Sequence, residues 1–398
     1  MLTERLEFIP ERDAEVFATV PAAPAVFLLR GEDAQAEPYV SKTADLRRRL
    51  HRLLGPVEER AKKLNLRDRV RSIEYALTGS DFESSFTLYK ILRETFPQTY
   101  AHRMRFRFAP LVKLHLANPY PRASITTRMG RLTGSALYYG PFQSRTAAEK
   151  FMNDSLDFFK MRRCVDDLHP DPAFPGCIYS EMKMCLAPCF KGCRDEEYSA
   201  EVKRVRTYFD SKGESLAREL SAQRDAFSTN LAFEDAAAIH LRLEKLKPML
   251  TQLPEIICRL DRLSALIIQP SHWSDSVTFF RVSSGAMVGP AVFCIQPTEH
   301  AKSQSMESRV SALLDSLPAA ETPTALETME HLALLKRWYY RGSRIGEIFL
   351  ANDKAVLPMR RIVRGIGRVL RGEAPEVETL PQGGAAASGN QDPSLRSG

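Results

Sequence analysis

Four cysteines in the middle of the chain constrain its fold more than any other feature. Cys164, Cys177, Cys185 and Cys189 are separated by twelve, seven and three intervening residues. Such short spacers let one chain wrap a single metal centre, and thiolates are ligands of tetrahedral zinc and of iron–sulfur clusters. The alternative is four packed or oxidised thiols. Cys193 is a fifth thiol that can substitute for Cys189, and the spacing does not decide between them.

The length of 398 residues predicts two or three domains, since one hydrophobic core does not grow to that size. No run of about eighteen uncharged apolar residues occurs, and the first residues are too acidic for a signal peptide. We therefore expect a cytoplasmic protein that does not associate with a membrane. Cysteines in that compartment stay reduced, which favours metal ligation over disulfides.

A long stretch of the chain is strongly basic. Between Glu94 and Glu149 there is no Asp or Glu, while arginines alternate with aromatic residues. Cations that neutralise phosphates, mixed with rings that stack on bases, are typical of a nucleic-acid surface. The alternative is a solvated basic face with no partner. The candidate DNA-binding residues are Arg103, Arg105, Arg107, Arg128 and Arg131.

The hydrophobic patterns predict an α+β, multidomain fold. Residues 24–31 and 38–42 predict a strand hairpin, which is followed by a helix capped by Asp45, a strand at 72–77 and a helix at 82–96. Residues 195–250 predict helices with breaks near Gly213 and Asn230, including an antiparallel helical hairpin. Strands follow around Gly285, residues 327–371 are expected to be helical, and the tail at 373–398 is expected to be disordered.

Several segments match one family in order. AVFLL and YVSKTADLRRRL resemble the strands and first helix of a GIY-YIG nuclease domain, and YYGPFQSRTAAEKF resembles the segment that follows it. FEDAAAIHLRLEKL resembles a UVR motif, and the cysteines resemble an iron–sulfur region. Over about its first 300 residues the chain thus resembles UvrC, the nuclease subunit of bacterial nucleotide excision repair. The division that this implies is a small GIY-YIG-like α/β domain (1–105), a basic linker with the Cys-rich metal-binding segment (106–194), a UVR helical region (195–252), a C-terminal α/β region (253–372) and a tail (373–398).

The resemblance implies a phosphodiester-cleaving site that is degenerate here. GIY-YIG nucleases use two tyrosines, a helix arginine, a lysine and one metal-binding glutamate, and Tyr39, Lys42 and Arg49 match three of these. The first tyrosine is replaced by Phe27, and a glycine by Ser41. Counted back from the proline that ends the helix, the glutamate position falls on a leucine, Leu88.

Leucine cannot hold Mg²⁺, which takes oxygen ligands, so we expect this nuclease to be lost or weakened. The opposing interpretations are that the alignment is shifted or that Glu74 or Asp81 supplies the ligand. Tyr39 and Arg49 are then either phosphate-binding residues or structural remnants. Mg²⁺ is expected only if the nuclease is active, and we find no motif of the second, RNase H-like nuclease.

The resemblance also implies a cofactor and a protein partner. The four cysteines are expected to hold an iron–sulfur cluster, [4Fe–4S], with zinc as the alternative. The UVR segment is expected to bind UvrB through Phe233, Ala236, Ala237 and Ile239, unless the preceding helix covers its apolar stripe.

Three hypotheses follow from the sequence. The first is a protein that binds DNA and UvrB with lost or weakened cleavage. The second is an active single-incision endonuclease similar to Cho, a shorter relative of UvrC. The third is an iron–sulfur sensor without a DNA role.

Overall fold

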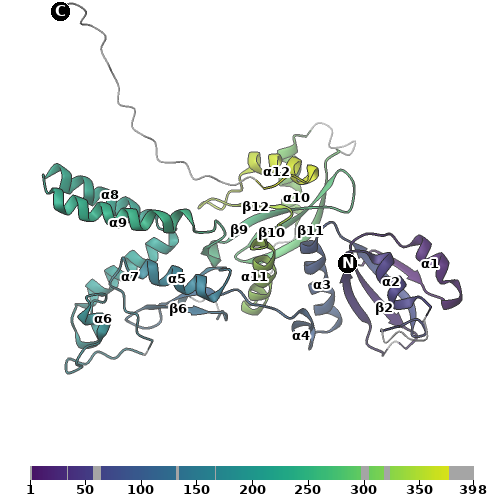
Figure 1. Cartoon of the computed structure of the whole chain (residues 1–398), viewed down its shortest axis with the longest axis horizontal. Helices are drawn as coiled ribbons and strands as arrows, with labels where there is room; N and C mark the ends of the chain where they lie inside the picture. Colours follow the sequence, from purple (N-terminus) through teal and green to yellow (C-terminus); the bar gives the residue numbers. More distant parts are fainter. Residues whose placement is uncertain are drawn as a thin grey trace, which may run out of the picture.

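Three antiparallel sheets of four strands each organise the part of the chain that the structure describes (Figure 1). The computed structural model describes residues 2–33, 35–56, 64–130, 134–165, 167–296, 304–317 and 323–375. The sheets have the strand orders β1-β4-β2-β3, β6-β5-β7-β8 and β11-β10-β9-β12. The expectation of an α+β fold is confirmed, whereas the domain division remains a prediction. No helix in the described ranges has both the length and the apolar composition that crossing a bilayer requires.

The first sheet carries helices on both faces. Its strands are β1 (Glu4–Glu7), β2 (Ala25–Gly31), β3 (Tyr39–Thr43) and β4 (Val70–Leu77), and short helices lie at Pro10–Arg12 (η1) and at Asp13–Thr19 (α1). The predicted β2–β3 hairpin is present, and Asp45 caps α2 (Leu46–Leu54) by accepting the Arg48 N–H. Since side chains alternate along β2, Phe27 packs on the α2 side and Val26 on the side of α3 (Asp81–Thr95).

Helix α3 lies between the first sheet and the C-terminal part of the chain (Figure 1). Ile91 packs on the first sheet, while Phe82 stacks edge-on against Phe280 at 4.9 Å between ring centroids. On the same side the hydroxyls of Tyr89 and Tyr100 each donate a 2.8 Å hydrogen bond to the buried carboxylate of Glu330. Both faces of α3 are therefore needed for packing, and nine of its fifteen residues are buried.

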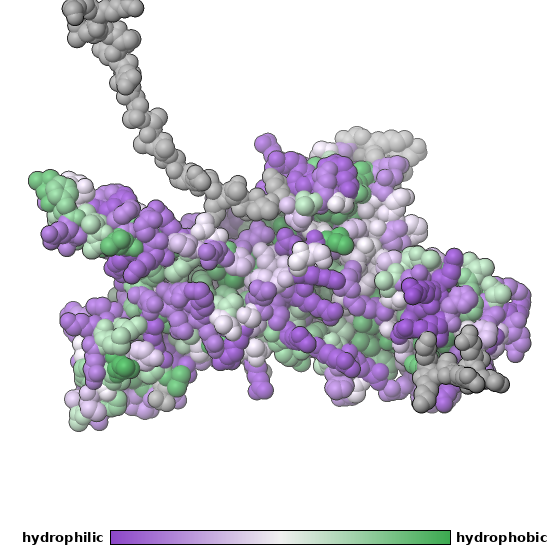
Figure 2. Space-filling model, in the orientation of Figure 1, coloured by the Kyte–Doolittle hydropathy of each residue, from purple (hydrophilic) through white to green (hydrophobic). Residues whose placement is uncertain are grey.

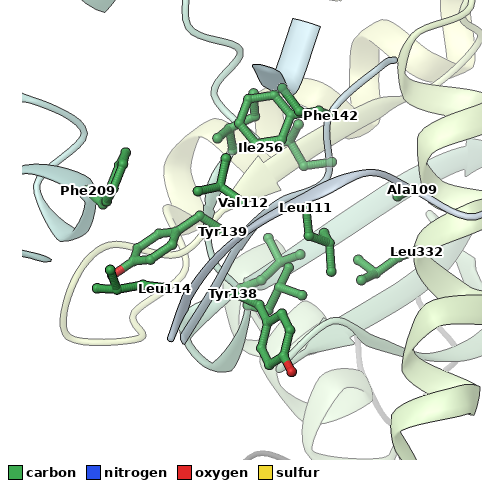
Figure 3. Close-up of a cluster of buried hydrophobic side chains, with 14 of the residues drawn as sticks. Ala109, Leu111, Val112, Leu114, Tyr138, Tyr139, Phe142, Phe209, Ile256 and Leu332 are labelled. Atoms are coloured by element: carbon green, nitrogen blue, oxygen red, sulfur yellow. The ribbon is translucent and has the colours of Figure 1, made fainter. Parts of the chain in front are cut away.

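The second sheet forms the middle of the molecule. It consists of β5 (Leu111–His115), β6 (Arg122–Thr126), β7 (Ala136–Gly140) and β8 (Cys258–Arg259), with α4 (Tyr100–Met104) before it and α5 (Arg145–Leu156) after it. Figure 3 shows its core, in which Tyr138 and Tyr139 point to opposite sides of β7 and Tyr139 faces Phe209 at 5.1 Å. This alternation buries one tyrosine ring on each face of the sheet.

A helical hairpin projects from the middle of the chain (Figure 1). The cysteine-rich loops hold α6 (Ile178–Glu181) and η2 (Pro188–Phe190), and α7 (Asp195–Asp210), α8 (Glu214–Thr229) and α9 (Phe233–Thr251) follow. The predicted breaks at Gly213 and Asn230 are confirmed. Gly213 has φ +92°, and a Cβ there would lie 2.1 Å from Leu250 Cδ2, so the start of α8 requires glycine.

The third sheet shows one prediction to be wrong. Its strands are β9 (Ser264–Pro270), β10 (Ser276–Ser283), β11 (Ala286–Cys294) and β12 (Glu347–Leu350), accompanied by η3 (Leu260–Arg262), α10 (Met306–Ser316), α11 (Ala325–Tyr339) and α12 (Met359–Arg371). The strands around Gly285 are confirmed, but residues 327–371 are not helical throughout, because Glu347–Leu350 pairs with β9. That pairing satisfies the free edge of β9, which no local pattern reveals. Most of the tail that we expected to be disordered, residues 376–398, lies outside the described ranges.

Candidate functional site

The residues that match a nuclease site lie on two faces of the first sheet. Arg49 Nη2 on α2 donates a 2.7 Å hydrogen bond to the Tyr39 hydroxyl, and Phe27 lies 6.0 Å from the Tyr39 ring. Phe27 is fully buried and pairs with Ser41. Arg49 Nε is buried without a hydrogen-bond partner among the described residues. The Tyr39–Arg49 pair therefore leaves one buried guanidinium donor unsatisfied.

Lys42 and Leu88 lie on the opposite face. Lys42 Nζ contacts Asp81 Oδ1 at 2.5 Å and Ser85 Oγ at 2.7 Å, both on α3. Leu88 packs against the apolar cluster of Val26 and Leu28. The structure thus brings Tyr39 to Arg49 and Lys42 to Asp81, but it does not bring the two pairs together.

The carboxylates that were alternatives for the metal position have other contacts. Glu74 Oε1 accepts from Arg30 Nε at 3.1 Å, and Asp81 is bonded to Lys42 as described. Glu83 is buried and its Oε2 accepts the Gly79 N–H at 2.8 Å. Burial raises the pKa of Glu83 to about 7, although the Gly79 hydrogen bond opposes the rise. None of these acids contacts Tyr39 or Arg49.

The four predicted metal ligands lie in the segment between α5 and α7. Leu186 N–H donates to Lys160 C=O at 3.0 Å, which places Cys185 beside the segment that carries Cys164. Cys177 lies at the start of α6, and Cys189 lies within η2. Two donors already point at sulfur: Arg162 Nη1 lies 3.2 Å from Cys164 Sγ, and Ala187 N–H lies 3.3 Å from Cys185 Sγ.

The thiols are close enough for their charges to interact. Burial raises the pKa of Cys185 to about 11, and the charges of Cys164, Cys189 and Cys177 add to the rise. The pKa of Cys189 is also raised, first by burial and then by Cys177. The pKa of Cys193 is raised as well, first by burial and then by the charges of Glu197, Asp195 and Cys189. Among the described residues, however, no three Cys, His, Asp or Glu side chains are already arranged to hold a metal ion.

The predicted DNA-binding arginines are exposed but not gathered at one point. Arg103 on α4 bonds Glu37 at 2.8 Å, Arg105 ends α4 with φ 51°, and Arg107 and Arg128 are exposed. Arg131 lies outside the described ranges.

Sequence reasoning did not predict that basic side chains from β5 and β6 share one face of the second sheet. Lys113 pairs with Ser124 and Tyr138, and its Nζ lies 5.8 Å from the Tyr138 ring. His115 pairs with Arg122 on the same face. The period-two alternation of β5 is the signal that predicts this grouping.

The hairpin exposes apolar residues at its tip. Phe233 is 64% exposed and Leu231 73%, and Figure 2 shows hydrophobic residues gathered there. Ala237 is exposed, and Ala236 and Ile239 are half-buried. Near the base of α9, Leu246 is fully buried, so α8 covers only part of the α9 stripe.

Comparisons with known proteins point to one family. Residues 109–208 match the model described as UvrC/Cho excinuclease, middle domain. The chain is 24% identical over 246 residues to UvrABC system protein C of Rickettsia bellii, covering 61% of this chain and 38% of the relative. The protein of the same name from Stenotrophomonas maltophilia strain K279a is 24% identical over 365 residues, covering 88% and 58%. The protein of the same name from Carboxydothermus hydrogenoformans is 24% identical over 281 residues, which cover 70% of this chain and 45% of the relative. The chain therefore matches less than two thirds of the length of these relatives. No solved structure matches the chain.

Proposed function

Because the chain belongs to the UvrC/Cho excinuclease family, we propose that it is a DNA-binding protein of nucleotide excision repair whose own strand cleavage is lost or weakened. The observation that carries this proposal is the acid-free stretch between Glu94 and Glu149. It folds into a sheet whose one face presents Lys113, Arg122 and a tyrosine ring. The cations neutralise phosphates, and the buried Tyr138 ring packs beneath Lys113 and holds it on this face.

Weakened cleavage is supported by the arrangement of the first sheet. Phosphodiester hydrolysis requires a divalent cation held by oxygen ligands beside the groups that bind the phosphate. The carboxylates of Glu74, Asp81 and Glu83 are bonded elsewhere, and Leu88 offers hydrocarbon.

The second candidate is an active single-incision endonuclease similar to Cho. The 2.7 Å Tyr39–Arg49 hydrogen bond favours it. A guanidinium can bind the phosphate, and the tyrosine oxygen beside it can help to activate the attacking water. Cleavage that Tyr39→Phe abolishes would establish this candidate.

The hairpin is the proposed UvrB contact. An apolar tip that α8 leaves uncovered is suited to a matching helical hairpin of the partner. Phe233→Ala is expected to weaken UvrB binding in a pull-down titration, whereas Lys245→Ala, exposed on another face of the same helix, is the matched control.

Cys164, Cys177, Cys185 and Cys189 are the proposed ligands of an iron–sulfur cluster, with zinc as the alternative. The chemistry of the donor set suits either metal, because thiolates are ligands of both and donors from Arg162 and Ala187 point at two of the sulfurs; binding would have to draw the four sulfurs together, since no three of the described side chains are yet arranged around one ion. The bound metal would supply a cross-link between the loops that carry the four cysteines, and it would neutralise the repulsion between the thiolates.

Duplex binding measured over a range of salt concentrations tests the proposal. Lys113→Gln and Arg122→Gln should each weaken binding and reduce the slope of log K against log salt by about 1 per phosphate contact. The exposed Arg360→Gln on α12 is the control. Binding that does not depend on salt, or equal losses in the control, would contradict the proposed surface. Unchanged affinity after replacing Arg103, Arg105 and Arg107 as well would favour the sensor without a DNA role.

A further inference from the structure

A positively charged cleft lies where the first sheet's helix meets the C-terminal part of the chain. The cleft has a volume of about 170 Å³ and lies between the N-terminus of α3 and the C-terminal end of α11 with the loop that follows it. These two helices are neighbours in Figure 1. The lining residues used below are Asp81, Ser85, Gln269, Arg337, Arg341 and Arg344.

The charges of this α3–α11 cleft are unbalanced. Asp81 is the one carboxylate among the lining residues, and it contacts both Lys42 Nζ at 2.5 Å and Arg341 Nη1 at 3.1 Å. Burial alone would raise the pKa of Asp81, but the Lys42 hydrogen bond and the charges of Lys42, Arg337 and Arg341 outweigh it, so the pKa lies below its ordinary value. Arg344 lies 4.7 Å above the Tyr339 ring. Three cations, Lys42, Arg337 and Arg341, thus act on one carboxylate, and Arg344 adds a fourth positive charge to the lining.

A buried amide supplies a second, independent observation. Gln269 on β9 is fully buried and lines the cleft, and its Oε1 has no hydrogen-bond partner among the described residues. A buried acceptor without a donor costs about 1–3 kcal/mol. A ligand that brings a hydroxyl or amino donor beside an anion would satisfy Gln269 and the cations together.

The salt bridge between Asp81 and Arg341 alone does not account for the cleft. The Asp81 and Arg341 side chains are 51% and 56% exposed, and ion pairs of this kind contribute about 0–1 kcal/mol. Asp81 forms ion pairs with Lys42 and Arg341, and Arg337 is a third cation whose charge acts on the same carboxylate. The N-terminus of the 15-residue α3 adds a favourable dipole for an anion at the same place.

We propose that the α3–α11 cleft binds a phosphate group of a nucleic-acid strand between Lys42, Arg337 and Arg341, with Gln269 accepting from a donor of the same nucleotide. When no strand is bound, Asp81 holds the cations in place of the phosphate. The inference rests on the proposed function and extends it, because it gives the C-terminal region a direct role in holding the strand. This second contact is separate from the face of β5–β7.

Two probes test the cleft on the full chain by fluorescence anisotropy: a labelled, 5′-phosphorylated thymidine trinucleotide and a 30-base-pair duplex. Asp81→Asn should tighten trinucleotide binding several-fold, since it frees two cations from a competing anion. Arg341→Gln should weaken trinucleotide binding about tenfold, which is the loss of one charged hydrogen bond. Arg360→Gln is the matched control. Arg337→Gln repeats the test at the third cation, in case Arg341→Gln fails to fold. Thymidine monophosphate as competitor distinguishes a free nucleotide from a strand.

Opposite effects of Asp81→Asn and the arginine variants support the cleft. Equal shifts in both, no shift in either, or no binding of the trinucleotide to Asp81→Asn would overturn it. If the duplex does not bind but the trinucleotide responds as expected, the proposed function fails and the cleft stands. If the duplex binds and the trinucleotide does not, the cleft fails and the proposed function stands.

Discussion

The buried carboxyl of Glu83 should make the stability of the α3 region fall as pH rises. Glu83 is 4% exposed, and burial raises its pKa from 4.5 to about 7. At about 1.4 kcal/mol per pH unit, this difference corresponds to about 3 kcal/mol. Since the folded state binds the proton more tightly than the unfolded state, the contribution is fully present below pH 4.5 and is lost as pH rises through 7.

Replacing Glu83 with glutamine isolates this effect. Glu83→Gln keeps an oxygen that accepts the Gly79 N–H but carries no charge. We expect it to be more stable than the wild type by about 3 kcal/mol at pH 8 and nearly equal to it at pH 4.5. Urea midpoints followed by circular dichroism from pH 4.5 to 8 measure both, with Glu196→Gln in the exposed first turn of α7 as control. A variant that is less stable than the wild type at pH 8 would refute the reasoning.

Three further predictions test the packing and the metal ligands. Leu246→Ala should lower the free energy of unfolding by about 2–5 kcal/mol because it opens a cavity under the hairpin, whereas the 63% exposed Leu241→Ala should change it by less than about 0.5 kcal/mol. Glu330→Ala should lower the free energy of unfolding by about 3 kcal/mol, since two tyrosine hydroxyls lose their shared acceptor. Thermal unfolding measures this, and an unchanged stability would contradict the prediction. Anaerobically purified protein should be brown and lose its iron in Cys185→Ser but keep it in Cys193→Ser; colourless protein with stoichiometric zinc would refute iron while leaving the ligands standing.

The parts of the fold that local patterns encode were predictable. The side chain of Asp45 caps α2 by accepting the Arg48 N–H. Gly213 marks a backbone conformation that only glycine adopts easily. The sequence likewise predicted the strands around Gly285 and the hairpin of α8 and α9. Each of these depends on residues a few positions apart.

What depends on long-range pairing was not predictable. Strand β12 forms because β9 offers a free edge, although the two are some eighty residues apart in the chain. Family motifs group Tyr39 with Lys42, but the alternation of β3 places them on opposite faces of the sheet. The contact of Asp81 with Arg341 spans 260 positions, and no pattern in either segment indicates it.

Strand cleavage is the central question, and a nicking assay answers it directly. A lesion-bearing duplex is incubated with the full chain and UvrB in Mg²⁺ and then in Mn²⁺, and binding and nicking are scored on the same samples. The account predicts that the duplex is bound and remains intact. Nicks that Tyr39→Phe abolishes would contradict it.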